Sequence, residues 1–217
     1  MSEKVKGTPA DDPSPKSLKK AVATRFAAAF LLLGLMFFLP AWTFDYWQAW
    51  VYLIILFVPM SIMVRYLYKH DRALLERRMR MRERQKTQTL IIALSFLFFL
   101  PAFIIPGFDV RFGWSNVPSV IVIIADAIVL LGYLFFALVL KTNSYASRIV
   151  EVEKGQRVIT TGPYAIVRHP MYLASLILYG FSPLALGSYW GMIPVILLVI
   201  VIAARIKGEE EELLENL

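Results

Sequence analysis

Long runs of apolar residues restrict what this chain can fold into more than any other feature. The clearest run, residues 117–140, holds a single charged residue, Asp126. About 20 predominantly apolar residues in a helix are enough to cross the hydrocarbon core of a bilayer. Hydrophobic residues make up 58% of the 217 positions, above the roughly half that is usual in soluble domains. Strands of alternating polarity, which are typical of membrane barrels, are absent from the pattern. The sequence therefore predicts an all-α integral membrane protein.

Four of these runs lie before residue 141 and predict four transmembrane helices. They cover residues 24–42, 49–68, 89–105 and 117–140. Between the last two runs, residues 107–116 include Gly107, Asp109 and Gly113, which predict a turn. Residues 1–20 are rich in proline and lysine and predict a disordered leader. The predicted transmembrane region is therefore 21–140, and residues 141–217 form a second region.

A basic segment, residues 69–88, separates the second run from the third. Its arginines interleave with leucines and methionines, and they are Arg72, Arg77, Arg78, Arg80, Arg82 and Arg84. This pattern predicts a helix that lies at the membrane surface. The alternative is a specific binding site for anionic lipid head groups.

The last apolar stretch, residues 171–206, is interrupted by Gly187-Ser188-Tyr189-Trp190-Gly191. A single helix of this length, rising 1.5 Å per residue, would exceed a bilayer core of about 30 Å. Two shorter helices that form a hairpin fit the bilayer better. The stretch is followed by Lys207, Gly208 and an acidic run, residues 209–212.

The basic residues predict how the chain is oriented in the membrane. Of the 23 lysines and arginines, Arg111 alone falls in a loop predicted on the outer side. Cytoplasmic loops carry an excess of lysine and arginine. We therefore expect the N-terminus and the polar segment 141–170 to face the cytoplasm. The net charge of +7 follows from this topology and does not indicate a nucleic-acid partner.

Several chemistries are excluded by composition. The chain has no cysteine, which rules out disulfides, thiol nucleophiles and thiolate metal sites. His70 and His169 are the only histidines, so no metal site is predicted.

Polar and aromatic residues concentrate in residues 161–172, just before the hairpin. The hairpin would bring His169 and Tyr172, at the start of its first helix, close to Arg205 and Glu209, at the end of its second. Polar groups at this depth need partners or a ligand. The alternative is an ionic cluster at the membrane surface, in which arginines pair with Glu209 and Glu210.

The order of residues in this segment resembles a known cofactor motif. Residues 155–164 follow the pattern G-x-x-[VL]-[VI]-x-x-G-x-Y, and Arg168-His169-Pro170-Met171-Tyr172 follows R-H-P-x-Y. Both patterns, followed by a helical hairpin and an R-x-x-x-E ending such as Arg205 to Glu209, resemble the isoprenylcysteine carboxyl methyltransferase family. Phospholipid N-methyltransferases are similar in the same region. The resemblance covers about residues 141–214.

The resemblance implies S-adenosylmethionine as methyl donor, in a site that faces the cytosol. The residues it places around the cofactor are Glu151, Gln156, Arg157, Val158, Ile159, Gly162, Tyr164, Arg168, His169, Pro170, Met171, Tyr172 and Glu209. It implies that Arg205 faces the acidic group of the substrate. Glu210 or His169 would act as the base if the acceptor is an amine. The family often has glycine where this chain has Ala174.

We therefore expect a membrane methyltransferase whose lipid or lipidated acceptor enters from the bilayer, with a prenylcysteine-like carboxylate preferred. The open alternatives are a phospholipid amine N-methyltransferase, an NADPH-dependent membrane reductase and a non-catalytic module that binds anionic lipid. For each of two further residues, two roles are open. Asp126 is a functional intramembrane acid or a buried hydrogen-bonding group. Asn143 caps a helix or contacts the cofactor.

Overall fold

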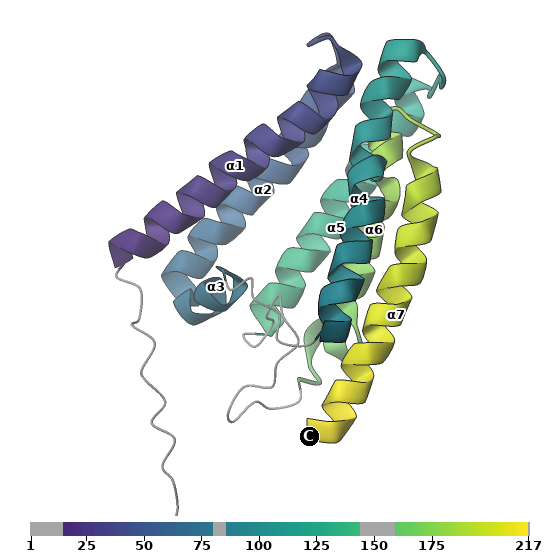
Figure 1. The fold of residues 1–217 in the computed structure, drawn as a ribbon. Coiled ribbons are helices and arrows are strands. Elements are labelled where there is room, and N and C mark those ends of the chain that lie inside the picture. The colour runs from purple at the N-terminus through teal and green to yellow at the C-terminus, as the bar shows by residue number, and fades with distance from the viewer. Residues whose placement is uncertain (1–14, 80–85, 144–158, 217) are drawn as a thin grey trace, which may run out of the picture.

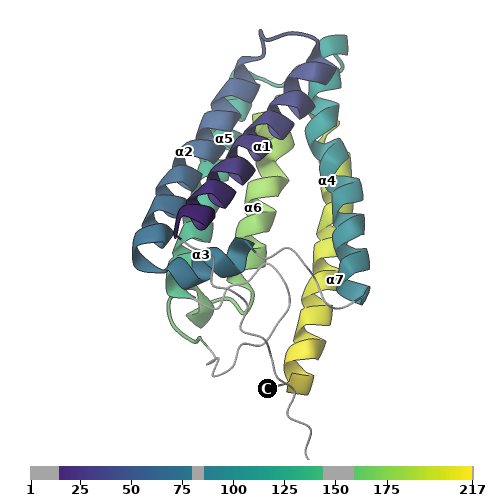
Figure 2. The same cartoon turned by 60° about the vertical axis from the view of Figure 1, so that its left-hand side comes forward.

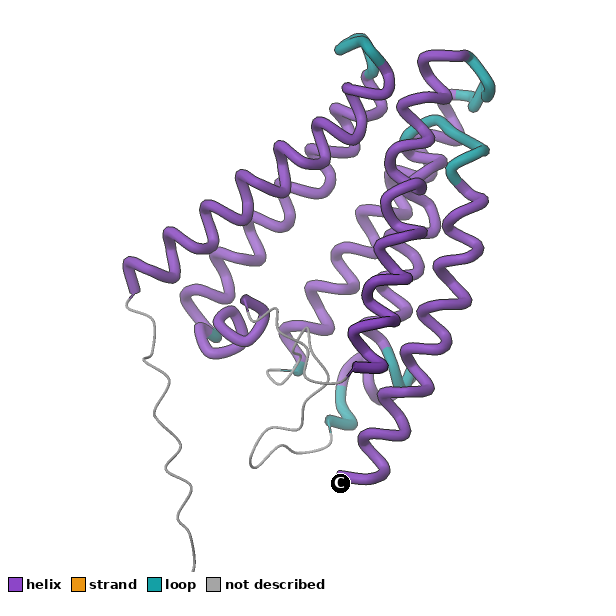
Figure 3. Tube along the Cα trace, in the orientation of Figure 1, coloured by secondary structure: helices purple, strands orange, loops and turns teal. Residues whose placement is uncertain are grey.

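The protein is a bundle of long helices whose connecting loops collect at its two ends (Figures 1 and 3). The computed structural model describes residues 15–79, 86–143 and 159–216, and all regular elements within them are helical. The elements are α1 Pro15–Ala41, α2 Trp47–His70, α3 Arg72–Met79, α4 Lys86–Phe112, α5 Ser119–Thr142, the 3-10 turn η1 Gly162–Ala165, α6 Pro170–Ala185 and α7 Met192–Asn216. The all-α class predicted from the sequence is confirmed.

Three of the described helices are long and apolar enough to cross a membrane. They are Leu18–Ala41 within α1, α2 and α5. They correspond to the first, second and fourth of the predicted spans. The third predicted span, residues 89–105, lies within α4, and its role as a membrane span stays a prediction.

The predicted hairpin is present. α6 ends at Ala185 and α7 begins at Met192, and between them Gly187 adopts a φ of +77°, which glycine reaches without a steric penalty. α7 continues beyond the apolar stretch of residues 171–206 and ends at Asn216. The glutamates and leucines after Gly208 are good helix formers and carry the helix past it.

The predicted leader of residues 1–20 is also too long. Residues 1–14 lie outside the described part of the chain, but α1 already begins at Pro15. Leu18 is only 3% exposed, and burial of this side chain draws the first turns of α1 into the bundle. The buried leucines at this point, which we call the basal cluster, are Leu18, Leu67, Leu74, Leu75 and Leu140.

The basic segment does not form one helix across residues 69–88. Lys69 and His70 end α2, and Lys86 begins α4. The break lies at Asp71, whose Oδ1 accepts a hydrogen bond of 2.9 Å from the backbone N–H of Leu74. A side chain of this kind caps the start of a helix, so α3 begins as a separate helix. Residues 80–85 lie outside the description.

The predicted turn at 107–116 begins later than expected, since Gly107 and Asp109 lie within α4. A Cβ at Gly107 would lie 2.7 Å from the carbonyl oxygen of Phe37 and 2.9 Å from the Cβ of Pro40. The glycine therefore lets α4 approach α1 closely, which is a packing role rather than a turn role.

Asp109 is a buried acceptor that joins two loops. Its carboxylate accepts 2.6 Å hydrogen bonds from the backbone N–H and the hydroxyl of Ser115, and one of 2.5 Å from the hydroxyl of Ser188. Ser188 belongs to the turn between α6 and α7. These bonds hold the end of α4 against the hairpin turn.

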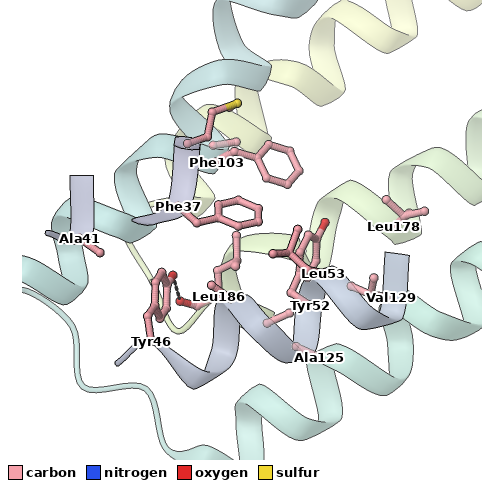
Figure 4. Packing of buried hydrophobic residues seen from close by; sticks show 14 of the residues in the cluster. Phe37, Ala41, Tyr46, Tyr52, Leu53, Phe103, Ala125, Val129, Leu178 and Leu186 are labelled. Carbon is pink, nitrogen blue, oxygen red and sulfur yellow. Dashed lines mark hydrogen bonds between the residues drawn. The ribbon is translucent and has the colours of Figure 1, made fainter. Parts of the chain in front are cut away.

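The main core lies between α1, α2, α4, α5, α6 and the start of α7 and is rich in aromatic rings (Figure 4). The Phe37 ring packs against those of Tyr52 and Phe103, with centroids 5.9 and 6.0 Å away. Two tyrosine hydroxyls find polar partners: Tyr46 donates to the carbonyl of Leu186 at 2.6 Å, and Tyr52 lies 2.5 Å from the hydroxyl of Ser182. These bonds connect Tyr46, the N-cap residue of α2, and Tyr52 within α2 to the hairpin.

Positive charge collects at one end of the bundle, which we call the basic end. α1 begins there, α2 and α5 end there, and α3 lies across it (Figures 1 and 2). Among the described residues, Arg111 in the last turn of α4 is the one lysine or arginine at the opposite end. The charge segregation fits the predicted topology, and the cytoplasmic position of the basic end stays a prediction.

Substitution of Gly107 by alanine tests the close approach of α4 to α1. The added Cβ would clash with backbone atoms of α1, and overpacking of this kind costs about 1–3 kcal/mol. We expect Gly107→Ala to lower the midpoint of thermal unfolding in detergent, followed by circular dichroism. Gly34→Ala is the matched control, because nothing lies within 4 Å of a Cβ at Gly34. Equal midpoints for the two variants would contradict this packing.

Candidate functional site at the basic end

The turn η1 packs against the end of α5 through a glycine. Gly162 has a φ of +59°, and a Cβ at this position would lie 3.1 Å from Cγ2 and 3.2 Å from Oγ1 of Thr142. Backbone conformation and close approach both favour glycine here. Pro163, the next residue, is buried. Gly162 and Pro163 are therefore fixed to the last turn of α5.

A hydrogen bond between side chains holds Tyr164 in place. Asn143 is the C-cap residue of α5, and its Nδ2 donates to the hydroxyl of Tyr164 at 2.8 Å. The capping role considered for Asn143 is confirmed, and its side chain in addition contacts a residue of the motif. The aromatic face of Tyr164 thus lies at the junction of α5 and η1.

His169 and Pro170 form the start of α6. His169 is the N-cap residue with a φ of −120°, and Pro170 occupies the first helical position, where its fixed φ suits a helix and no N–H is needed. The His169 ring lies 5.9 Å from the Tyr172 ring, at an interplanar angle of 63°. The R-H-P-x-Y pattern therefore places an imidazole beside a phenol ring at the base of α6.

Arg78 of α3 reaches the same place from another part of the chain. Its Nη1 lies 3.9 Å from Sδ of Met171, and its guanidinium lies 5.2 Å from the centre of the Phe136 ring. The basal cluster holds α3 against the ends of α2 and α5. The sequence did not distinguish Arg78 from the other arginines of the basic segment, because the contact depends on how α3 packs.

The end of α7 lies at the same end of the bundle. α6 is 16 residues long, and the same number of residues counted from Met192 reaches Lys207. Residues 205–210 are therefore level with the start of α6, although the two helices diverge toward the basic end (Figure 2). The side chains of Arg205, Glu209 and Glu210 lie outside the description. That the two helices enclose a common site stays a prediction.

The remaining predicted site residues fall into two groups. Ile159 is half-buried and Arg168 is exposed. Ala174, where the family often has glycine, is fully buried. The residues that lie outside the described part of the chain are Glu151, Gln156, Arg157 and Val158.

Asp126 lies in the middle of α5 and is 5% exposed. Neither carboxyl oxygen has a hydrogen-bond partner among the described residues. The expected bond to a serine or tyrosine of a neighbouring helix is therefore not found there, and Tyr52 and Ser182 bond to each other instead. A buried polar group without a partner is costly. The functional interpretation of Asp126 stays a prediction.

Comparison with known proteins identifies the region that carries this site. Residues 120–217 match the family model described as phospholipid methyltransferase. No curated protein and no solved structure matches the chain. The match includes α5, η1, α6 and α7, which are all the elements of the candidate site except α3. The candidate site thus lies in the part of the chain that is similar to the phospholipid methyltransferases, a family of integral membrane methyltransferases that resemble the isoprenylcysteine carboxyl methyltransferases.

Proposed function

We propose that the protein transfers a methyl group from S-adenosylmethionine to a lipid or lipidated acceptor at the basic end of the bundle. The family match supports methyl transfer to lipids. The observation that carries the proposal is that Tyr164, bonded to Asn143 at the end of α5, and the ring pair of His169 and Tyr172 at the start of α6 both lie at the junction of these two helices. Together these phenol and imidazole side chains, at the ends of apolar helices, suit a cofactor that is both aromatic and charged.

The chemistry of these side chains fits the proposed cofactor. S-adenosylmethionine supplies a methyl carbon on a cationic sulfonium, next to an adenine ring. A tyrosine face can stack on adenine or attract the cation, and the hydrogen bond from Asn143 keeps Tyr164 in one position. The carboxylate of Glu209 would pair with the methionyl ammonium through charge-assisted hydrogen bonds.

The acceptor would be held by its acidic group. Arg78 lies beside Met171 of the motif, and Arg205 lies in the part of α7 that is level with it. Arginine binds carboxylate and phosphate through two parallel hydrogen bonds. We propose that these two arginines hold the phosphate or carboxylate of a lipid that enters sideways, between the apolar helices.

Catalysis would depend on alignment. The side chains at the base of α6 would hold the acceptor atom in line with the methyl carbon, and the surrounding helices would exclude water. A carboxylate acceptor needs no base. An amine acceptor must first lose a proton, and His169 or Glu210 would accept it.

The two acceptor classes are supported by different observations. The family match favours a phospholipid amine. The resemblance of residues 141–214 to the isoprenylcysteine carboxyl methyltransferases supports a prenylcysteine-like carboxylate, although the R-H-P-M-Y motif itself fits both acceptor classes.

Binding of S-adenosylhomocysteine is the direct test of the cofactor site. We expect calorimetry on the full-length protein in detergent to show binding, and His169→Ala to weaken it at least about tenfold, the effect of losing one good polar contact. The control is His70→Ala, since His70 is exposed and stacks on Tyr66. Absence of binding to the unmodified protein, with thermal protection by NADPH, would instead support the reductase.

The dependence of rate on pH separates the two acceptor classes. A lipid ammonium has a pKa near that of lysine, about 10.4, whereas a carboxylate ionises near pH 4. With an amine acceptor, kcat/KM should rise up to about tenfold per pH unit between pH 7 and 9, because the neutral amine becomes more abundant. With a carboxylate acceptor it should stay level. The measurement uses radiolabelled methyl donor with phosphatidylethanolamine or a prenylated cysteine.

Removal of the Arg78 charge tests the recognition of the acceptor. Loss of a charged hydrogen bond costs about 1.5–3 kcal/mol, so we expect Arg78→Gln to raise KM for the lipid about tenfold or more and to leave the affinity for S-adenosylhomocysteine unchanged. Arg78→Lys should recover only part of the loss, because lysine lacks the planar fork. Arg72→Gln removes the same charge from α3, where Arg72 pairs with Glu76 at 2.8 Å. If the Arg72 variant raises KM equally, Arg78 has no specific role.

A further inference from the structure

A groove runs between α1 and α2, outside the residues that match the family. It has a volume of about 710 Å³, and residues of these two helices line it. The groove extends along α1 from Lys19 to Leu31, a length of about 18 Å at a rise of 1.5 Å per residue. Its length and position in two membrane-span helices are suited to an extended hydrocarbon chain.

The groove exists because α1 has small side chains on this face. Ala23 and Ala27, one turn apart, contribute only methyl groups to the lining. The larger side chains beside them, Phe26 and Phe30, are held by edge-to-face contacts with Phe57 at 5.0 and 5.1 Å. The result is an open groove flanked by aromatic side chains that pack against α2.

The interior of the groove offers little to a polar ligand. Ser61 lines it, but its hydroxyl already donates to the carbonyl of Phe57 at 2.7 Å. Apart from Lys19, Arg65 and Tyr68, the other lining residues are apolar. The part of a ligand that lies along Ala23 and Ala27 must therefore be a hydrocarbon.

The charged lining residues lie toward the basic end. Lys19 belongs to the first turns of α1, and Arg65 lies close to the end of α2. Both side chains are exposed, and the Lys19 Nζ lies 5.2 Å from the centre of the Tyr68 ring. No acidic residue lines the groove. A ligand with an apolar chain and an anionic group at one end matches this distribution of charge.

We propose that the groove is a binding site for an anionic phospholipid. One acyl chain lies along Ala23 and Ala27, and Lys19 and Arg65 hold the phosphate of the anionic head group. Basic pockets between transmembrane helices at the membrane surface recognise anionic head groups in this way. The site involves no residue that we assign to methyl transfer, so the lipid held here is not the acceptor.

The test compares lipid retention by full-length variants that lose the same charge. The protein is equilibrated with equal amounts of phosphatidylglycerol and phosphatidylcholine, and bound lipid is counted by native mass spectrometry. We expect the unmodified protein to retain phosphatidylglycerol preferentially. The double variant Lys19→Gln/Arg65→Gln should reduce this preference on the order of tenfold, because it removes the attraction of two basic side chains near the membrane surface for anionic lipid. The control, Lys20→Gln/Lys69→Gln, removes two exposed charges outside the groove and should keep the preference.

A second pair of variants tests whether the groove holds the acyl chain. Ala27→Leu fills the groove, whereas Ala28→Leu adds the same volume to an exposed position that does not line it. We expect Ala27→Leu alone to reduce the amount of retained phosphatidylglycerol. Binding of S-adenosylhomocysteine, measured on every variant, reports whether the protein is folded. Equal lipid loss in the two members of either pair would show general attraction to the membrane surface and overturn the proposal.

Discussion

The packing of α6 against α5 is the contact on which the candidate site depends. A Cβ at Gly132 would lie 2.9 Å from Cγ2 of Ile177 and 3.1 Å from the backbone nitrogen of Leu178, so the two helices touch almost backbone to backbone. At the base of the same pair, Gly162 lies against Thr142. Because these contacts fix where α6 begins relative to the end of α5, they also fix Tyr164 and His169. If this packing were lost, Tyr164 and His169 would move apart even though neither residue had been substituted.

The residues before the family match contribute to the site through apolar packing. The basal cluster draws α1, α2, α3 and α5 together at the basic end. This packing positions α3 so that Arg78 reaches Met171. The helices of the first half of the chain therefore do more than anchor the domain, since they supply an arginine to the proposed acceptor site and form the lipid groove between α1 and α2.

Patterns of local origin were predicted well, and roles that depend on distant partners were not. The run lengths predicted the helices, and the glycine-bounded turn predicted the hairpin, because both follow from the rise of a helix and the conformational freedom of glycine. Gly107 and Asp109 looked like turn residues for equally local reasons. Their actual roles depend on Phe37 and on Ser188, which is 79 positions away from Asp109.

By itself, the sequence determined the membrane class, the separation of charge between the two ends, and the motif that relates the chain to membrane methyltransferases. These properties reside in composition and in residues close together along the chain. The tertiary structure decided that Asn143 holds Tyr164, that Arg78 joins the base of α6, and that Asp126 has no partner among the described residues. The physical reason is that such contacts depend on which helix faces which, and in this bundle glycines and buried leucines far apart in the chain set those faces.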